Sequence, residues 1–383
     1  GKNYIIPSTF DPRLISVIPS AVADAAMKSG VARKKIDSLE DYRDELINRL
    51  DPSMSVMQGI NAKVRKKPKK VIFAEGEDEN MLKAAIEFGK NRLGIPILIG
   101  AEKRIKEQLK KIGLDENYKI QIVNSTDKEK REKYVKYLYK KLQRDGQLER
   151  DVDRLVRNDR IAWGSSMIAC NDADAMVTGN IRHYAASIEK LKKVVAPRPG
   201  EEIFGMTMMV SKGKTILVAD TNVQDFPSAE RLVNVSISCV RVARLFGFDP
   251  KVAFLSHSTF GKPVSKNTKH VRDAIDLLKT KNVDFDFDGE MQPDVALNEI
   301  YQEIYPFSKI VGKANILVMP ALHSAAISTK LMKSFGGAKL IGPLLIGLGL
   351  PIEIAPLRSS TSDILNLASI AAYSSEVIDY KKD

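Results

Sequence analysis

Residues Lys251–Asn298 read KVAFLSHSTFGKPVSKNTKHVRDAIDLLKTKNVDFDFDGEMQPDVALN, a pattern typical of an α/β protein. A short apolar run, Val252–Leu255, leads into a turn of small residues at Ser256–Gly261. We predict a helix over Lys269–Lys281 and a strand over Val283–Phe287, where apolar residues alternate with aspartates. Strand, loop, helix and strand form a βαβ unit of a parallel sheet. Because ligands of such sheets bind beyond the carboxyl ends of the strands, we expect an anion at the loop after the first strand.

Strand and helix signals alternate in the same way along most of the chain. Further strands are predicted at Val71–Ala74, Ile95–Ile99, Tyr118–Val123, Ala175–Thr178, Ile316–Val318, Lys339–Ile341 and Ile352–Ile354. Further helices are predicted at Met81–Arg92, Lys103–Lys111, Asp127–Arg144, Glu149–Asn158, Ile161–Asn171, Tyr184–Val194, Ala229–Phe246, Ser324–Phe335 and Ser362–Tyr373. Phe204–Val210 and Thr215–Ala219 are expected to pair as an antiparallel hairpin.

The length of 383 residues suits two domains of ordinary size. We expect two α/β/α domains with mixed, mainly parallel sheets and a ligand cleft between them. The first domain would be discontinuous, comprising residues 51–197 and 346–383, and the second would comprise residues 198–345. A short helical segment, residues 1–50, precedes them. It holds an expected helix that Asp11-Pro12 starts and Gly30 stops, and another from Ser38 to about Leu50.

The composition favours a cytoplasmic globular protein over a membrane or secreted one. The sequence contains no apolar run long enough to span a bilayer, and its two cysteines, Cys170 and Cys239, lie in apolar contexts that favour free thiols. The net charge of +12 raises the question of nucleic acid. The strongest basic cluster, Lys63–Lys70, contains a proline and lacks aromatic residues, so we interpret it as a solvated linker and expect no nucleic-acid partner.

Two glycine motifs fail the tests for nucleotide binding. Gly213-Lys214-Thr215 has the ending of a phosphate-binding loop, but Met208 occupies the place of the first glycine. The segment Gly347-Leu348-Gly349 lacks the third glycine of a dinucleotide fingerprint. The sequence therefore shows no NADP site. Its four histidines have no partners at ligand spacing, so we expect no metal site either.

Several separate motifs carry a resemblance to a known family. They are LSHSTFG with FDGEMQPDVALN, ADAMVTG, LVADTNVQDFPSAERL and IGPLLIGLGLPIEIAPLRSSTSDILNL, and they extend from about Pro68 to Tyr373. This combination resembles the phosphate acetyltransferases. It resembles still more the acetyltransferase-like module at the C-terminus of large NADP-dependent malic enzymes. Residues 1–50 are similar to the closing helices of the malic enzyme catalytic module, which would hold NADP and a divalent metal upstream of this chain.

The resemblance implies a site for acetyl-CoA or CoA, and a homo-oligomer of at least two copies. Asp363 matches the family's catalytic aspartate, and Asp220 lies in a segment that lines the family's cleft. Hydroxyl groups, backbone N–H groups and guanidinium groups suit the oxygens of phosphate. The residues expected to contact acetyl-CoA or phosphate are therefore Asn180, Arg182, Asp220, Ser256, Ser258, Thr259, Lys262, Arg358 and Ser360.

The sequence also departs from the phosphate acetyltransferase pattern. The family has a Ser-Arg pair six to seven residues before the aspartate, where this chain has Pro356 and Leu357, with Arg358 one place off. A second family arginine falls on Glu189, and this exchange reverses the charge beside a phosphate. We therefore expect an acetyl-CoA-sensing, catalytically impaired module of a malic enzyme, which converts malate to pyruvate and CO2. A working phosphate acetyltransferase and a purely structural dimerisation module are the alternatives.

Overall fold

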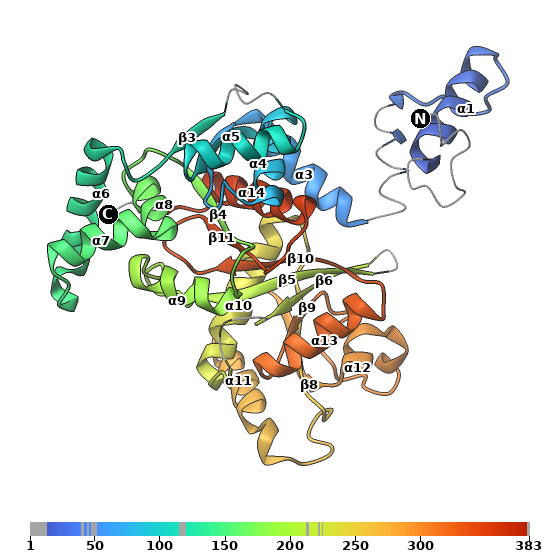
Figure 1. The fold of residues 1–383 in the computed structure, drawn as a ribbon. Coiled ribbons are helices and arrows are strands. Elements are labelled where there is room, and N and C mark those ends of the chain that lie inside the picture. Colours follow the sequence, from blue (N-terminus) through green and yellow to red (C-terminus); the bar gives the residue numbers. More distant parts are fainter. Residues whose placement is uncertain are drawn as a thin grey trace.

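The computed structural model describes residues 14–39, 42–43, 46, 52–114, 120–211, 214–220, 223 and 225–380. Two sheets with helices on their faces form the body, and α1 (Leu14–Lys28) lies apart from them (Figure 1). This arrangement confirms the predicted α/β class with mixed, mainly parallel sheets. The helix α1 ends close to Gly30, which has the left-handed φ of +76° expected of a stop signal. The helix predicted from Ser38 falls largely outside the described residues.

The first sheet is entirely parallel. Its strands, in spatial order, are β11 (Ile352–Ala355), β4 (Ala175–Gly179), β1 (Lys69–Phe73), β2 (Gly94–Ile99) and β3 (Gln121–Val123). Strand β11 comes from near the C-terminus. The chain therefore forms the second sheet between β4 and β11 of the first sheet. The helices that surround it are α3 (Pro52–Lys66), α4 (Glu79–Lys90), α5 (Glu102–Lys111), α6 (Lys128–Leu142), α7 (Glu149–Asn158), α8 (Arg160–Ala169), α9 (Tyr184–Val194) and α14 (Thr361–Val377).

The second sheet is mixed. Its strands, in spatial order, are β10 (Lys339–Ile346), β5 (Phe204–Ser211), β6 (Lys214–Ala219), β9 (Ile316–Val318), β7 (Lys251–Leu255) and β8 (Asp286–Met291). Strand β5 runs antiparallel to both β10 and β6, which confirms the predicted hairpin, and the remaining pairs are parallel. The helices of this part are α10 (Ala229–Leu245), α11 (Lys269–Thr280), α12 (Pro293–Leu297) and α13 (Leu322–Ser334).

Both sheets contribute to one continuous apolar core. In β1 the side chains of Val71 and Phe73 pack into this core, whereas Ile72 packs into a separate cluster on the opposite face. This alternation follows from the period of two in a strand, and a strand buried on both faces is apolar throughout. The shared core also contains Met206 of β5 and Ile370 of α14. The helix α14 therefore packs between the two sheets and contacts strands of each.

Several predicted elements begin or end a few residues away from the observed bounds, and two strands of the second sheet differ in an instructive way. The strand predicted at Val283–Phe287 begins at Asp286 and ends at Met291, because its register pairs Asp286 with Lys251 of β7. The exposed aspartates Asp284 and Asp286 had suggested an earlier start. The strand predicted at Lys339–Ile341 continues to Ile346 because it pairs along the length of β5.

The basic cluster at residues 63–70 is not a solvated linker. Lys63–Lys66 ends the helix α3, and Lys69 begins β1. The helix was missed because Pro68 and the lysines suggested a loop, although Met57, Ile60 and Val64 are buried at helical spacing.

Candidate functional site

Three strands of the first sheet end at the same edge, and each leads directly into the amino end of a helix. Strand β1 precedes α4, β4 precedes α9, and β11 precedes α14. Since the three strands are neighbours and parallel, their connecting loops lie side by side. Helix amino ends present unpaired backbone N–H groups and a positive dipole, which together favour anions. This edge of the first sheet is therefore the first part of the candidate site.

Asn180 and Arg358 hold two of these loops together. The N–H of Arg358 donates to the carbonyl of Asn180 over 3.0 Å, and the N–H of Asn180 donates to Ala355 over 3.0 Å. Both residues are left-handed, with φ of +65° for Asn180 and +60° for Arg358. The preceding Gly179 has φ of +111°, and a Cβ there would overlap the carbonyl of Ala355. Left-handed residues other than glycine cluster at functional sites, so the geometry marks this loop pair.

Glu75 is a fully buried acid beneath these loops. Its carboxylate accepts hydrogen bonds from the hydroxyl of Thr178 at 3.0 Å and the N–H of Gly179 at 2.9 Å. The guanidinium of Arg182 lies 3.3 Å from the same carboxylate. Burial raises the pKa of Glu75 to about 7 despite the attraction of Arg182. Glu75 therefore titrates near neutral pH and competes with any ligand anion for Arg182.

The side chain of Asn180 is only partly satisfied. Its Nδ2 donates to Asp78 over 2.6 Å, and Asp78 also caps α4 by accepting the N–H of Met81 over 2.9 Å. The Oδ1 of Asn180 is buried and has no hydrogen-bond partner among the described residues. A buried amide oxygen without a donor is costly, which suits a position that a ligand or water completes.

Asp363 and Ser360 form a capping box at the start of α14. The hydroxyl of Ser360 accepts the N–H of Asp363 over 3.2 Å, and the carboxylate of Asp363 accepts the N–H of Ser360 over 3.1 Å and its hydroxyl over 2.8 Å. The expected catalytic residue, Asp363, and the expected ligand residue, Ser360, thus both hold the helix end. Arg358 is exposed, and the described residues provide no ion-pair partner for its guanidinium.

The second group of predicted residues lies at the carboxyl end of β7. Ser256, Ser258 and Thr259 are all buried, whereas Lys262 is exposed. The hydroxyl of Ser258 donates to the buried carboxylate of Glu290 over 2.8 Å.

Further bonds close this loop against β8 and its continuation. The hydroxyl of Thr259 accepts the N–H of Gln292 over 3.2 Å, and Thr259 and Lys262 exchange backbone bonds of 2.8 and 3.0 Å. The carboxylate of Glu290 also accepts the N–H of Gly261 over 3.1 Å and lies 3.7 Å from Arg272. These hydroxyls therefore shape the loop and leave Lys262 as its exposed cation.

Asp220 follows β6 and ties it to the start of β5. Its Oδ1 accepts the N–H of Gly205 over 2.9 Å and that of Val223 over 3.3 Å, while Arg231 of α10 lies 3.8 Å from its Oδ2. The predicted residues thus fall into three places. Asn180, Arg182, Arg358, Ser360 and Asp363 are brought together, the residues after β7 form a second group, and Asp220 stands in a third.

Three acids in these places, of which Glu75 and Glu290 are buried and Asp78 is partly buried, escaped the sequence prediction. Glu75 and Asp78 follow β1 at the edge of the first sheet, and Glu290 lies within β8. A single acid after an apolar strand carries no motif of its own. The available signal was position, because both Glu75 and Asp78 come directly after a predicted strand of a parallel sheet.

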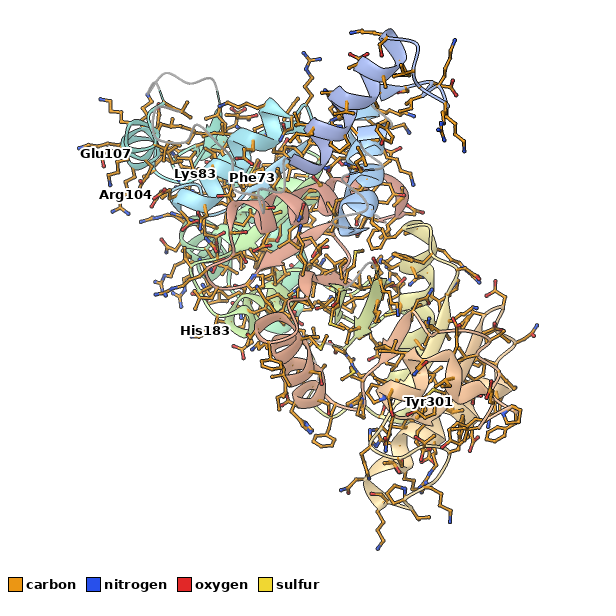
Figure 2. All side chains as sticks on the ribbon, turned by 90° about the vertical axis from the view of Figure 1, so that its right-hand side faces the viewer. Phe73, Lys83, Arg104, Glu107, His183 and Tyr301 are labelled. Carbon is orange, nitrogen blue, oxygen red and sulfur yellow. The ribbon has the colours of Figure 1, made fainter. Side chains whose placement is uncertain are left out.

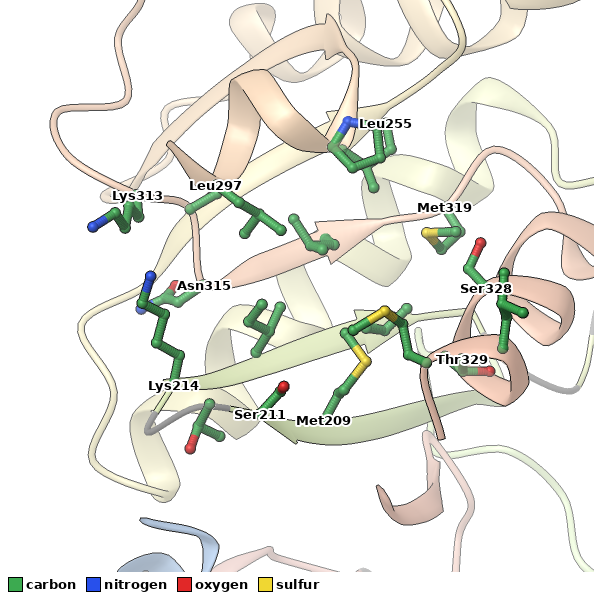
Figure 3. A pocket seen from close by; sticks show the side chains of 18 residues that line it. Met209, Ser211, Lys214, Leu255, Leu297, Lys313, Asn315, Met319, Ser328 and Thr329 are labelled. Atoms are coloured by element: carbon green, nitrogen blue, oxygen red, sulfur yellow. The ribbon is translucent and has the colours of Figure 1, made fainter. Parts of the chain in front are cut away.

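An apolar cavity lies on a different face. A cavity of about 670 Å³ opens over β5, β6 and β9, beneath α12 and α13 (Figure 3). Met209 and Met319 contribute to its apolar wall, and Lys214 and Lys313 lie at one end (Figure 3). None of the predicted site residues lines it. His183 does not line this cavity. It is an exposed residue at the amino end of α9, one of the helices around the first sheet (Figure 2).

Comparison with known proteins agrees with this architecture. A model of the family described as phosphate acetyl/butaryl transferase matches residues 55–372. The chain belongs to this family. The solved phosphotransacetylase EutD from Staphylococcus aureus matches with a TM-score of 0.76 at 26% identity, covering 84% of this chain and 98% of that one. A phosphate acetyltransferase of Clostridium acetobutylicum is 29% identical over 83% of this chain and 97% of its own length.

The relatives of higher identity are longer proteins. An NADP-dependent malic enzyme of Rhizobium meliloti is 46% identical over 374 residues, which are 97% of this chain and 49% of that enzyme. The corresponding enzyme of Escherichia coli is 34% identical over 377 residues. The chain thus spans about half the length of the malic enzymes that it matches, and nearly the whole length of the acetyltransferases. Among the described residues no helix has the length and apolar character required to cross a bilayer.

Proposed function

We propose that this family member is an acetyl-CoA-binding regulatory and oligomer-forming module of a cytoplasmic NADP-dependent malic enzyme, with impaired acetyltransferase activity. The observation that carries the proposal is the state of the predicted catalytic positions. The carboxylate of Asp363 is held in the capping box of α14, and Pro356 and Leu357 precede it where the family pattern has Ser and Arg. Neither side chain offers a donor for a transferring phosphoryl or acyl oxygen.

The edge of the first sheet still suits the phosphates of a CoA ester. Three helix amino ends face it, and two guanidinium groups lie beside them, that of Arg358, which is exposed, and that of Arg182, which also contacts Glu75. The unpaired Oδ1 of Asn180 supplies an acceptor in the same place. The site therefore retains groups that bind an anion and an amide or hydroxyl donor, although it lacks the pair expected to break the acyl–phosphate bond.

In the proposed mechanism, acetyl-CoA binds one arrangement of the module more tightly than another. The population shift biases the distant site at which malate is converted to pyruvate and CO2. NADP and the divalent metal would belong to the part of the malic enzyme outside this chain. The homo-oligomer, of at least two copies, would carry the change between subunits.

Calorimetric titration of the chain with acetyl-CoA tests the proposal. We expect saturable heat and a one-site isotherm, whereas the absence of heat at millimolar ligand would contradict it. Light scattering with and without acetyl-CoA reports the oligomer. A dimer that ignores every CoA ester would leave only the structural dimerisation role.

An active phosphate acetyltransferase is the second candidate, because the chain matches nearly the full length of the acetyltransferase relatives. The discriminating assay follows acetyl-CoA formation from acetyl phosphate and CoA. Turnover at ordinary enzymatic rates, on the order of 1 s⁻¹ or more, that is lost in Arg358→Ala would favour the enzyme. Regulatory binding without turnover favours our proposal.

A further inference from the structure

Tyr373 of α14 contacts the helices α3 and α10 away from the candidate site. Its hydroxyl accepts a hydrogen bond from the Nζ of Lys63 over 3.0 Å and donates to the carbonyl of Leu245 over 3.1 Å. The same ammonium lies 5.0 Å from the centre of the tyrosine ring, within the range of a cation–π interaction. Tyr373 is buried whereas Lys63 is exposed, so the phenol is shielded from bulk water and the ammonium group is not. One phenol therefore connects the last turn of α3, the last turn of α10 and the second half of α14.

The other ends of α10 and α14 reach the predicted site residues. The helix α14 starts beside Ser360 and Asp363 at the edge of the first sheet. Near the start of α10, Arg231 lies 3.8 Å from Asp220 and also pairs with Glu202. Each helix therefore has one end at a group of candidate ligand residues and its other part in contact with Tyr373.

The helix α3 is anchored to this junction by further contacts. Glu376 pairs with Lys67 and, at 2.7 Å, with Lys69, which begins β1. Arg65 donates to the carbonyl of Asn91 over 3.1 Å at the end of α4. Met57, Ile60 and Val64 are buried in the core that both sheets share, with Ile370 of α14. The helix α3 also contacts β6 of the second sheet. It follows α1 in chain order and is the first helix of the body, whereas α1 lies apart (Figure 1).

We propose that Tyr373, with Lys63 as its partner, is a coupling junction that transmits changes at the ligand edge to α3 and so to whatever precedes it in the chain. In its regulatory form this rests on the proposed function, because acetyl-CoA is the expected trigger. The mechanical coupling between helices does not rest on the proposed function. Loosening the capped end of α14 should affect α3 through Tyr373 whether or not acetyl-CoA binds. Tyr373 acts as a positioning residue and touches no ligand itself.

Hydrogen exchange at the amides of α3 provides the test, in a double-mutant cycle of Ser360→Ala and Tyr373→Phe. Loss of the cap in Ser360→Ala should accelerate exchange of α3 roughly threefold to tenfold in the wild-type background and have no effect in Tyr373→Phe. Lys63→Met should reproduce the effect of Tyr373→Phe without altering the core. Tyr139→Phe is the matched control. Tyr139 lies in α6, which packs against α7 and α8, so this variant should leave the effect of Ser360→Ala on α3 exchange intact.

A second arm adds saturating acetyl-CoA. We expect protection of α3 in the wild type, and its loss in Tyr373→Phe with unchanged calorimetric affinity. Ligand binding without any change in α3 would overturn the junction and leave the proposed function standing. Absence of binding would remove the proposed function, and the mutant cycle would then decide alone. Additive effects of Ser360→Ala and Tyr373→Phe on α3 would refute the junction.

Discussion

Arg358 donates its backbone N–H to the carbonyl of Asn180 over 3.0 Å, and both residues are left-handed. This bond fixes the backbone of Arg358 to a loop that begins at a different strand. The left-handed conformation is unfavourable for side chains with a Cβ, so it persists because the two loops determine each other. The exposed arginine is thereby presented beside the amino ends of α9 and α14.

Arg358→Gly removes the positive charge of the side chain and keeps the left-handed backbone conformation. Glycine adopts the same φ without strain, so we expect a melting temperature close to that of the wild type. The affinity for acetyl-CoA should fall roughly tenfold or more, because a charge-assisted hydrogen bond to phosphate contributes about 1.5–3 kcal/mol. Calorimetry and thermal unfolding measure the two effects. Arg92→Gly is the matched control, since Arg92 is also left-handed, with φ of +56°, but follows the end of α4. Equal affinity in both variants would show that Arg358 does not bind the ligand.

Glu75 should make stability depend on pH. Burial raises the pKa of Glu75 from 4.5 to about 7, so the folded protein holds this proton more tightly than the unfolded chain does. Its contribution to stability is complete below about pH 4.5 and is lost as the pH rises through about 7. The shift of about 2.5 pH units corresponds to about 3 kcal/mol.

The variant Glu75→Gln removes this titration. Relative to the wild type, its free energy of unfolding should improve by up to about 3 kcal/mol between pH 5 and pH 8 in urea titrations. Glu189→Gln, at an exposed position of α9, should show no such trend. Parallel pH profiles for wild type and Glu75→Gln would contradict the assignment of the titrating group.

Ser360→Ala should destabilise the protein by about 1 kcal/mol, because it removes the acceptor for the N–H of Asp363 at the start of α14. Ser228→Ala removes the equivalent cap of α10, where the serine accepts the N–H of Arg231 over 3.2 Å, and should cost a similar amount. Chemical unfolding measures both. Ser360→Ala alone should also weaken acetyl-CoA binding, since only that hydroxyl lies at the predicted ligand edge. Equal loss of affinity in the two variants would indicate a global effect.

Glu290→Ala should be among the more damaging single changes in the second group. It removes the acceptor of Ser258 and of the N–H of Gly261, and leaves Arg272 without its nearby carboxylate. Breaking such a buried network costs about 3–5 kcal/mol. Ser258→Ala, which removes the hydrogen bond to Glu290 and the 3.2 Å contact with the hydroxyl of Ser256, should cost about 1–3 kcal/mol. Urea unfolding distinguishes them, and a smaller loss for Glu290→Ala than for Ser258→Ala would contradict the network.

Much of the fold follows from local pattern. The runs Val252–Leu255 and Ala175–Thr178 identify strands that are buried on both faces, and the loops after them contain several of the predicted ligand residues. The extent of β8 was beyond this reasoning, because Asp284 and Asp286 alternate like strand residues although only Asp286 pairs with β7. Register is a property of two strands, and one strand's sequence does not contain it.

The candidate site was predicted less completely, for a related reason. Arg358 and Asn180 were proposed separately, but the backbone bond between them joins residues that are far apart in the chain. Ser360 and Asp363 have the spacing of a capping box, which the resemblance to a catalytic aspartate obscured. Glu75 becomes a candidate site residue only in the structure, through its burial and its contact with Arg182. Burial of a lone acid has no sequence signature.

Restoring the family pattern tests whether the lost positions explain the expected lack of turnover. The triple variant Pro356→Ser, Leu357→Arg and Glu189→Arg supplies a hydroxyl and two guanidinium groups, and removes one anion from the phosphate side. Since guanidinium groups stabilise the charge of a transferring phosphoryl group, acetyl-CoA formation from acetyl phosphate should rise at least roughly tenfold above the wild-type rate. The variant with only Glu189→Arg is the control and should give a smaller gain, because the hydroxyl and the first guanidinium are still missing. High turnover in the wild type would contradict impairment directly, and an unchanged rate in a folded triple variant would show that other residues prevent the reaction.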